Sequence, residues 1–151
     1  KGRGTMGKKW ISKKGNLFLS IFFDMSKKKI DFKKFAVLNA YLLRNILAKK
    51  FSNKIIIKWP NDLLFKKKKI CGILQETVNN AGKKFLVVGI GVNTNFDPKN
   101  SNFSSTSLKQ ITNKNIDNKK LLIMIKKNYE TLLFKANKNS FSDLKKFTQN
   151  I

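Results

Sequence analysis

Histidine is absent from this sequence of 151 residues, and cysteine occurs once, as Cys71. The lack of histidine removes the usual zinc ligand, and one cysteine cannot form an intramolecular disulfide, so we expect Cys71 to be a small buried thiol. No apolar run approaches the roughly 20 residues that a membrane-spanning helix needs, and nothing resembles a signal peptide. We therefore expect a cytoplasmic protein that does not contact a membrane.

Arginine and acidic residues are also scarce. Only Arg3 and Arg44 are arginines, so 31 of the 33 basic residues are lysines, against 8 Asp and Glu, and the formal net charge is +25. Proteins that read nucleic acids rely on arginine forks for base edges and phosphates, whereas these lysines are scattered over every segment. We expect no specific nucleic-acid partner, only salt-dependent adhesion to polyanions. A basic RNA-binding module stays open as an alternative.

The most informative stretch is Lys-Trp-Pro-Asn-Asp at residues 58–62, which follows the apolar run Ile55–Ile57. The run predicts a buried strand over residues 55–58, and Pro60 ends it because proline cannot donate to a sheet ladder. Asn61 and Asp62 would then stand at a strand end beside a large aromatic ring. An amide next to a carboxylate suits a hydrated Mg²⁺ or a ribose–phosphate.

A basic run at residues 66–69 follows and leads into a strand that contains Gly72. A lysine for a phosphate, a carboxylate for a metal and a flat apolar slot are the parts of a nucleotide-dependent activation site. Within the run we expect Lys69 to act at the reacting centre and Lys67 to be a solvated neighbour. The alternative is a strand, a polar turn and a second strand whose lysines are only solvated.

Glycine is concentrated at the beginning of the chain, where residues 2–10 hold three glycines in six positions and end at Trp10. Glycines let backbone amides approach an anion closely. Arg3 and the neighbouring lysines add positive charge, and the tryptophan can stack or anchor the far end. The spacing of lysine and Ser/Thr is not that of a Walker motif. The alternative is a flexible surface loop.

Residues Ile70–Val78 and Lys84–Val92 predict an antiparallel hairpin, because the Asn-Asn-Ala-Gly sequence between them is a turn signal. If the loop has an even number of residues, Gly72 of the first strand can face Gly89 or Gly91 of the second. Such a pair would form a slot without side chains, which suits a flat ligand. The alternative for these glycines is a pair of bulges.

The other apolar patterns predict scaffold elements around these motifs. They are a strand over Leu17–Phe23, a helix over about Phe32–Lys50 capped by Asp31, a polar loop through residue 107, a helix from Asp117 to about Asn137, and a last helix capped by Ser142.

The order of four motifs resembles the catalytic domain of biotin–protein ligases. A glycine-arginine-glycine loop ending in tryptophan, then Lys-Trp-Pro-Asn-Asp, Lys-x-x-Gly-Ile-Leu and Gly-x-Gly-x-Asn, stand at Gly2–Trp10, Lys58–Asp62, Lys69–Leu74 and Gly89–Asn93. The second and third motifs together are a specific signal. The resemblance covers nearly the whole chain and implies an α/β (α+β) fold: a mixed, largely antiparallel sheet with helices packed on one side, similar to class II aminoacyl-tRNA synthetases.

The resemblance also implies an ATP-dependent ligase that activates biotin as biotinyl-adenylate and transfers it to a lysine of a biotin carboxyl carrier protein, with ATP and Mg²⁺ as co-substrates. Lys69 and Asp62 would be catalytic, and Asp62 would hold Mg²⁺. The closest alternative is a lipoyl or octanoyl ligase, whose site shares the core architecture but not the Trp-Pro-Asn-Asp run. The residues implied to bind biotin or the adenylate are Arg3, Gly4, Thr5, Trp10, Trp59, Asn61, Lys69, Gly72, Leu74, Gly89, Val92 and Asn93.

The sequence departs from the family pattern within the glycine loop and in the segments expected before and after the catalytic domain. Thr5 stands where the family often has a further arginine, which bears on retention of the adenylate. The family carries a Ser-Thr-Asn element before the glycine loop, and this sequence opens at Lys1 without it. We expect residues 1–151 to be a single catalytic domain, truncated on its N-terminal side, without the family's C-terminal barrel-like domain.

Overall fold

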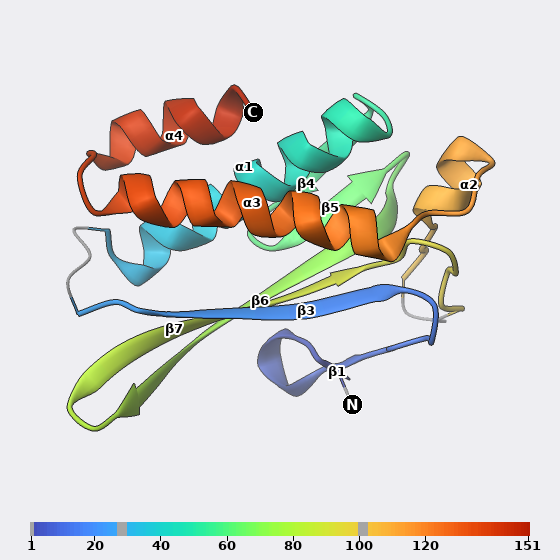
Figure 1. Ribbon diagram of the computed structural model, residues 1–151. Helices are drawn as coiled ribbons and strands as arrows, with labels where there is room; N and C mark the ends of the chain where they lie inside the picture. Colours follow the sequence, from blue (N-terminus) through green and yellow to red (C-terminus); the bar gives the residue numbers. More distant parts are fainter. Residues whose placement is uncertain (1, 27–29, 100–102) are drawn as a thin grey trace.

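A five-stranded antiparallel sheet in the order β3-β7-β6-β5-β4 organises the structure (Figure 1). The structure is a computed structural model that describes residues 2–26, 30–99 and 103–151. The predicted largely antiparallel sheet is confirmed. The strands are β3 (Leu17–Asp24), β4 (Ile55–Lys58), β5 (Asp62–Phe65), β6 (Lys68–Asn80) and β7 (Lys83–Val92).

Three longer helices pack on one side of this sheet, and the first residues of the chain lie on the other side (Figure 1). Among the described residues, no helix is both long and apolar enough to cross a membrane. The helices are α1 (Phe32–Lys50), α2 (Leu108–Thr112), α3 (Asn118–Ala136) and α4 (Phe141–Gln149).

Two of the three predicted helix caps are confirmed, and one is wrong. The carboxylates of Asp31 and Asp117 accept backbone N–H groups in the first turns of α1 and α3. For α4, the cap is Ser140 and not Ser142: the Ser140 hydroxyl accepts the N–H of Asp143, whose carboxylate accepts the Ser140 N–H in return. Such a reciprocal capping box satisfies two N–H groups, so it starts the helix two residues earlier.

Two short elements were not predicted from the sequence. Strand β5 falls inside the stretch interpreted as a polar turn, and α2 begins at the end of the predicted polar loop. Elements of four and five residues contain too few positions to show a period. Both are held by neighbours: β5 pairs with strands on both sides, and the N–H of Leu108 donates to the carbonyl of Asn93.

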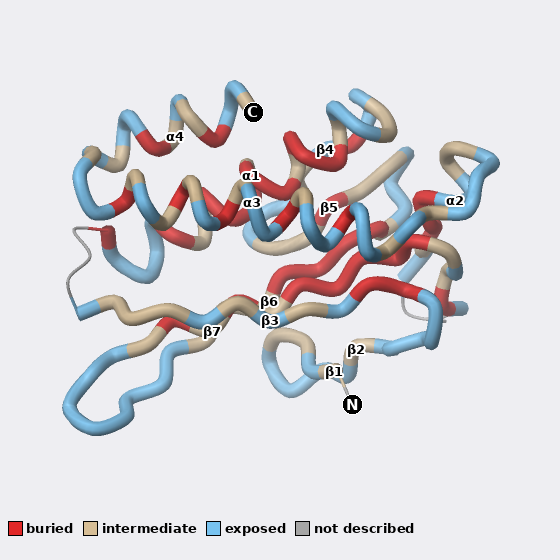
Figure 2. The backbone as a smooth tube through the Cα atoms, viewed as in Figure 1, coloured by how far each residue is buried: buried red, intermediate tan, exposed pale blue. Residues whose placement is uncertain are grey.

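The core lies between the sheet and the helices (Figure 2). Along β7, Leu86, Val88 and Ile90 are buried against this helix layer, because successive side chains of a strand point to opposite faces. Helix α1 contributes the predicted stripe of Phe35, Leu38, Leu42 and Ile46, all buried. We call the other face of the sheet, which none of the helices α1 to α4 covers, the open face (Figure 1).

The β6–β7 hairpin has the even loop that the glycine slot requires. Asn80 pairs with Lys83, so the turn is Ala81-Gly82, and both turn residues have positive φ, as a two-residue hairpin turn of the primed type demands. Gly72 therefore faces Gly91, with Leu74 beside Gly89. The register that the sequence left open is thus the one that forms the slot.

Candidate functional site

The glycine-rich beginning of the chain is a small hairpin on the open face (Figure 1). Strand β1 (Gly2–Arg3) pairs with β2 (Lys9–Trp10), with a short 3-10 turn, Thr5–Gly7, between them. The N–H of Gly4 donates to the carbonyl of Lys8 at 2.7 Å. We call residues 2–10 the flap. The glycines predicted a loop here, and the structure closes that loop into a hairpin.

The glycine slot on the sheet is filled by the indole of Trp10. Gly72 and Gly91 are neighbours on β6 and β7, and a side chain at either position would overlap that ring. A Cβ atom on Gly91 would stand 2.6 Å from Cε2 of Trp10. Two facing glycines therefore let the flap dock flat on the sheet, and the flat group for which the sequence predicted a slot is supplied by the chain itself.

A salt bridge fixes the other edge of the flap. The guanidinium of Arg3 lies 2.7 Å from the carboxylate of Glu76 on β6. Because Gly72, Leu74 and Glu76 alternate along one strand, all three face the flap. Glu76 was not predicted from the sequence, although an even separation from Gly72 on the same strand would have placed it on the same face of the sheet.

Lys69 reaches the open face because β6 contains an irregularity. Leu63 of β5 pairs with Cys71, but Leu64 pairs with Lys69, so Ile70 is an extra residue on β6. A bulge of this kind shifts the alternation of side chains by one position. Ile70 thus stays buried in the core while Lys69 points into the space below the flap.

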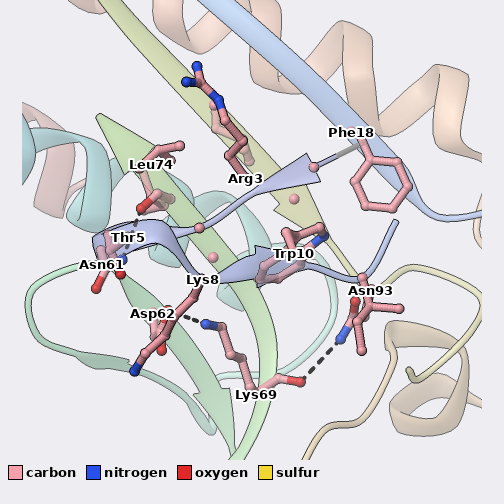
Figure 3. A pocket seen from close by; sticks show the side chains of 18 of the residues that line it. Arg3, Thr5, Lys8, Trp10, Phe18, Asn61, Asp62, Lys69, Leu74 and Asn93 are labelled. Carbon is pink, nitrogen blue, oxygen red and sulfur yellow. Dashed lines mark hydrogen bonds and ion pairs between the residues drawn. The ribbon is translucent and has the colours of Figure 1, made fainter. Parts of the chain in front are cut away.

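The ammonium of Lys69 is held by one carboxylate and two aromatic rings. Its Nζ lies 2.7 Å from Oδ1 of Asp62, and each of these side chains is only 19% exposed (Figure 3). The same Nζ lies 5.1 Å from the ring centroid of Trp10 and 5.5 Å from that of Phe103. A cation in such a partly dry setting interacts strongly with negative charge that develops beside it. The structure brings the two predicted catalytic residues into direct contact.

Two asparagines hold the strands around this pair. The amide of Asn61 donates to the carbonyl of Ile73, and the Ile73 N–H donates back to the Asn61 carbonyl. The buried amide of Asn93 donates to the carbonyls of Lys69 and Thr106. Its Oδ1 has no hydrogen-bond partner within the described residues, and Asn93 lines the cavity. The side chains of both therefore fix the backbone near Lys69.

These elements enclose a cavity of about 980 Å³ between the flap and the open face. Its lining contains six cations and two carboxylates, and both carboxylates are already paired, Asp62 with Lys69 and Glu76 with Arg3. The cavity therefore favours an anionic ligand. The cations are Arg3, Lys8, Lys9, Lys58, Lys67 and Lys69.

Most of the residues implied by the resemblance line this cavity, but two do not. Trp59 lies outside it: the ring is half exposed and packs edge-on against Tyr41 of α1, with centroids 5.7 Å apart. Val92 is buried in the core. It lies two residues after Ile90 on the same strand, so its side chain also faces the helices. The implied residues that do line the cavity are Arg3, Gly4, Thr5, Trp10, Asn61, Asp62, Lys69, Gly72, Leu74, Gly89 and Asn93.

Lys67 is exposed, as the sequence analysis expected of a solvated neighbour of Lys69, and it is also one of the cavity-lining cations. Phe103 also lines the cavity and was not predicted. It comes from a segment whose position on the sheet depends on tertiary contacts, so no local pattern indicates it.

A metal ion would find few ligands here. Within the described residues no group of three His, Cys, Asp or Glu side chains is placed to hold an ion. Asp62 supplies one carboxylate, and Asn61 stands beside it in the sequence. Mg²⁺ is often bound through one or two carboxylates together with substrate phosphates. The residues fit an ion that arrives with a phosphate ligand and do not fit a dedicated protein cage.

Cys71 lies directly behind the site and is inert. Burial, and next the Asp62 carboxylate, raise the pKa of its thiol to about 12, although Lys69 acts in the opposite direction. Since the thiolate is the reactive form of cysteine, this side chain is a core residue, as the sequence predicted.

Residues 1–95 match the model of the Biotin/lipoate A/B protein ligase family. The bifunctional ligase/repressor BirA of Escherichia coli is 34% identical over 94 residues, which are 61% of this chain and 29% of that protein. BirA of Bacillus subtilis is 31% identical over 124 residues, which are 77% of this chain and 38% of that protein.

A solved structure extends the match beyond the family model. The biotin protein ligase from Aquifex aeolicus, in complex with biotin and ATP, superposes with a TM-score of 0.80 at 30% identity, and the match covers 94% of this chain and 60% of that one. The chain thus spans between about a third and three fifths of the length of these relatives.

Proposed function

Because this chain belongs to the Biotin/lipoate A/B protein ligase family, we propose that it carries the activation site of an ATP-dependent biotin–protein ligase. In the first step a carboxylate oxygen of biotin attacks the α-phosphorus of ATP. The bond from that phosphorus to the bridging oxygen breaks, and pyrophosphate leaves with the electron pair. In the second step a lysine amine of a biotin carboxyl carrier protein attacks the acyl carbon of biotinyl-adenylate, and AMP leaves.

The partly buried Lys69–Asp62 pair is the observation that supports this proposal most directly. Two anions, a carboxylate and a triphosphate, must approach each other in the first step, and their repulsion opposes the reaction. Lys69 supplies a cation held by Asp62 in a partly buried site beneath the flap, where such a charge is worth more than in bulk water. Asp62 orients this ammonium group until the substrates bind.

The position of the flap supports a second part of the proposal, which is that the adenylate is protected from water. A mixed anhydride is hydrolysed if water reaches it, and closing segments exclude water from such intermediates. Here the flap is attached at two points, through Trp10 in the glycine slot and through Arg3 on Glu76. Thr5 and Gly4 line the cavity from this flap.

Mg²⁺ would enter with ATP as a co-substrate. Asp62 is the carboxylate that would hold it, and Asn61 stands next to that carboxylate. The ion would neutralise phosphate charge during the attack. Removal of Mg²⁺ by a chelator should therefore abolish activation.

The test is biotin-dependent exchange of labelled pyrophosphate into ATP by the purified protein. We expect exchange with biotin, none without it, and label transfer to a carrier-protein lysine in a second assay. Exchange with lipoate or octanoate but not with biotin would assign the chain to the lipoyl branch of the same family. Tight, salt-independent RNA binding without exchange would instead favour a nucleic-acid module.

A further inference from the structure

The turn between β5 and β6 consists of two lysines in an unusual conformation. Phe65 pairs with Lys68, so Lys66 and Lys67 form a two-residue hairpin turn, and their φ angles are 47° and 64°. Such turns prefer Asn and Gly, because a positive φ brings Cβ close to the backbone in other residues. A two-residue hairpin turn of the primed type demands these φ angles, as it does at Ala81-Gly82.

The two side chains of this turn have different environments. The Nζ of Lys66 lies over the ring of Phe65, 5.7 Å from its centroid, and Lys66 does not line the cavity. Lys67 lines the cavity together with Leu64 and Lys69. Lys66 and Lys67 are adjacent and both have positive φ, but only Lys67 lines the cavity of the proposed reaction site.

Lys67 lines the same cavity as two other lysines, Lys58 and Lys8. Lys58 pairs directly with Asp62 across β4 and β5, so both side chains lie on the same face of the sheet. Lys8 of the flap extends toward the same end of the cavity as Asp62 and Lys69 (Figure 3). The carboxylate of Asp62 is occupied by Lys69.

Several cations of the cavity lining are left without an acidic partner among the described residues. Within the described residues, Lys8, Lys58 and Lys67 form no salt bridge. Several unpaired lysines that line one cavity suit a ligand with several negative charges. A polyphosphate has this chemistry, whereas the single carboxylate of biotin does not need three cations.

We propose that Lys67 binds the β- and γ-phosphates of the nucleotide, and hence the pyrophosphate that leaves in the adenylation step. This inference rests on the proposed function for the identity of the nucleotide, but the polyphosphate chemistry follows from the cations alone. When the bond to the α-phosphorus breaks, negative charge grows on the departing pyrophosphate. Lys67 stabilises that charge from the turn, while Lys69 acts at the α-phosphate.

The decisive experiment compares two neighbouring substitutions, Lys67→Gln and Lys66→Gln. Each removes one positive charge from the same turn, so each changes the net charge of the protein equally. Calorimetric titration with inorganic tripolyphosphate at low salt should show about fivefold weaker binding for Lys67→Gln. Lys66→Gln should bind like the wild type. Lys67→Arg keeps a cation at the cavity and should restore most of the affinity.

Equal losses for Lys66→Gln and Lys67→Gln would overturn the inference, because they would show that only the overall charge matters. Unchanged affinity for both would overturn it too. The tripolyphosphate titration needs neither biotin nor turnover, so it stays readable if the wild-type protein fails the pyrophosphate-exchange assay. If exchange is observed, Lys67→Gln should raise the KM for ATP and leave the KM for biotin unchanged, whereas Lys66→Gln should alter neither.

Discussion

The two faces of the sheet differ in the side chains that they present. On the helix-covered face, β7 presents Leu86, Val88 and Ile90, each buried in the core. On the open face the same strand presents Gly89 and Gly91, which leave room for a ring from the flap. The helix-covered face contributes buried apolar area to the core. The open face leaves space in which the flap can pack against the sheet. A substitution should therefore affect stability on the first face and ligand chemistry on the second.

Leu86→Ala should have the largest effect, and it acts on stability. Leu86 is fully buried, so truncation leaves a cavity and lowers the free energy of unfolding by about 2–5 kcal/mol. Val87→Ala, at the next position but on the open face, should cost about 1 kcal/mol or less. Urea unfolding of both variants measures the difference. Equal losses would show that the two faces are buried alike.

Lys69→Ala should have the next largest effect, and it acts on activity. Removing the cation beside the reacting phosphate should lower biotin-dependent pyrophosphate exchange by about 10²-fold or more, with little change in unfolding. Lys68→Ala removes an exposed neighbour that does not line the cavity and is the control. Small and equal losses for the two variants would contradict a special role for Lys69.

Gly91→Ala should disturb the flap and leave the core intact. A methyl group at this position overlaps the indole of Trp10, and such overpacking should weaken flap docking by about 1–3 kcal/mol. Gly89→Ala is the control, since its Cβ would meet only Leu74 at 3.7 Å. Tryptophan fluorescence, recorded in a Trp59→Phe background, should shift toward longer wavelength for Gly91→Ala alone. The same spectrum in both variants would mean that Trp10 does not occupy the slot.

Cys71 should give the smallest effect, visible only at high pH. Its thiol has a pKa of about 12 in the folded protein against 9.0 as the reference value, so the folded state favours the protonated form. Its contribution to stability is complete below pH 9 and is lost as the pH rises toward 12. The pH dependence of unfolding should therefore be shallower above pH 9 in Cys71→Ala. A thiol reagent at pH 8 should react only after unfolding, and rapid reaction with the folded protein would contradict this burial.

Local sequence patterns determined three of the four α-helices, four of the five strands of the sheet and the order of the four motifs. The stripe on α1 and the Asp31 and Asp117 caps depend on residues within a few positions of each other, so they can be predicted from a single segment. The even turn at Ala81-Gly82 sets the register of its hairpin in the same way. The motif order, compared with a known family, indicated the site residues.

Only the tertiary structure decided which of these residues meet and on which face. The extra residue at Ile70 turns Lys69 toward Asp62, and a bulge depends on pairing with another strand, which the sequence of one strand does not contain. Trp10 reaches Gly72 and Gly91 across more than sixty positions of the chain, because the flap docks onto the sheet. The same docking gives Glu76 its partner, while the β5–β6 turn gives Lys67 a place in the cavity that adjacent Lys66 lacks. Contacts between distant segments are set by packing of the whole chain, so composition and periodicity do not reveal them.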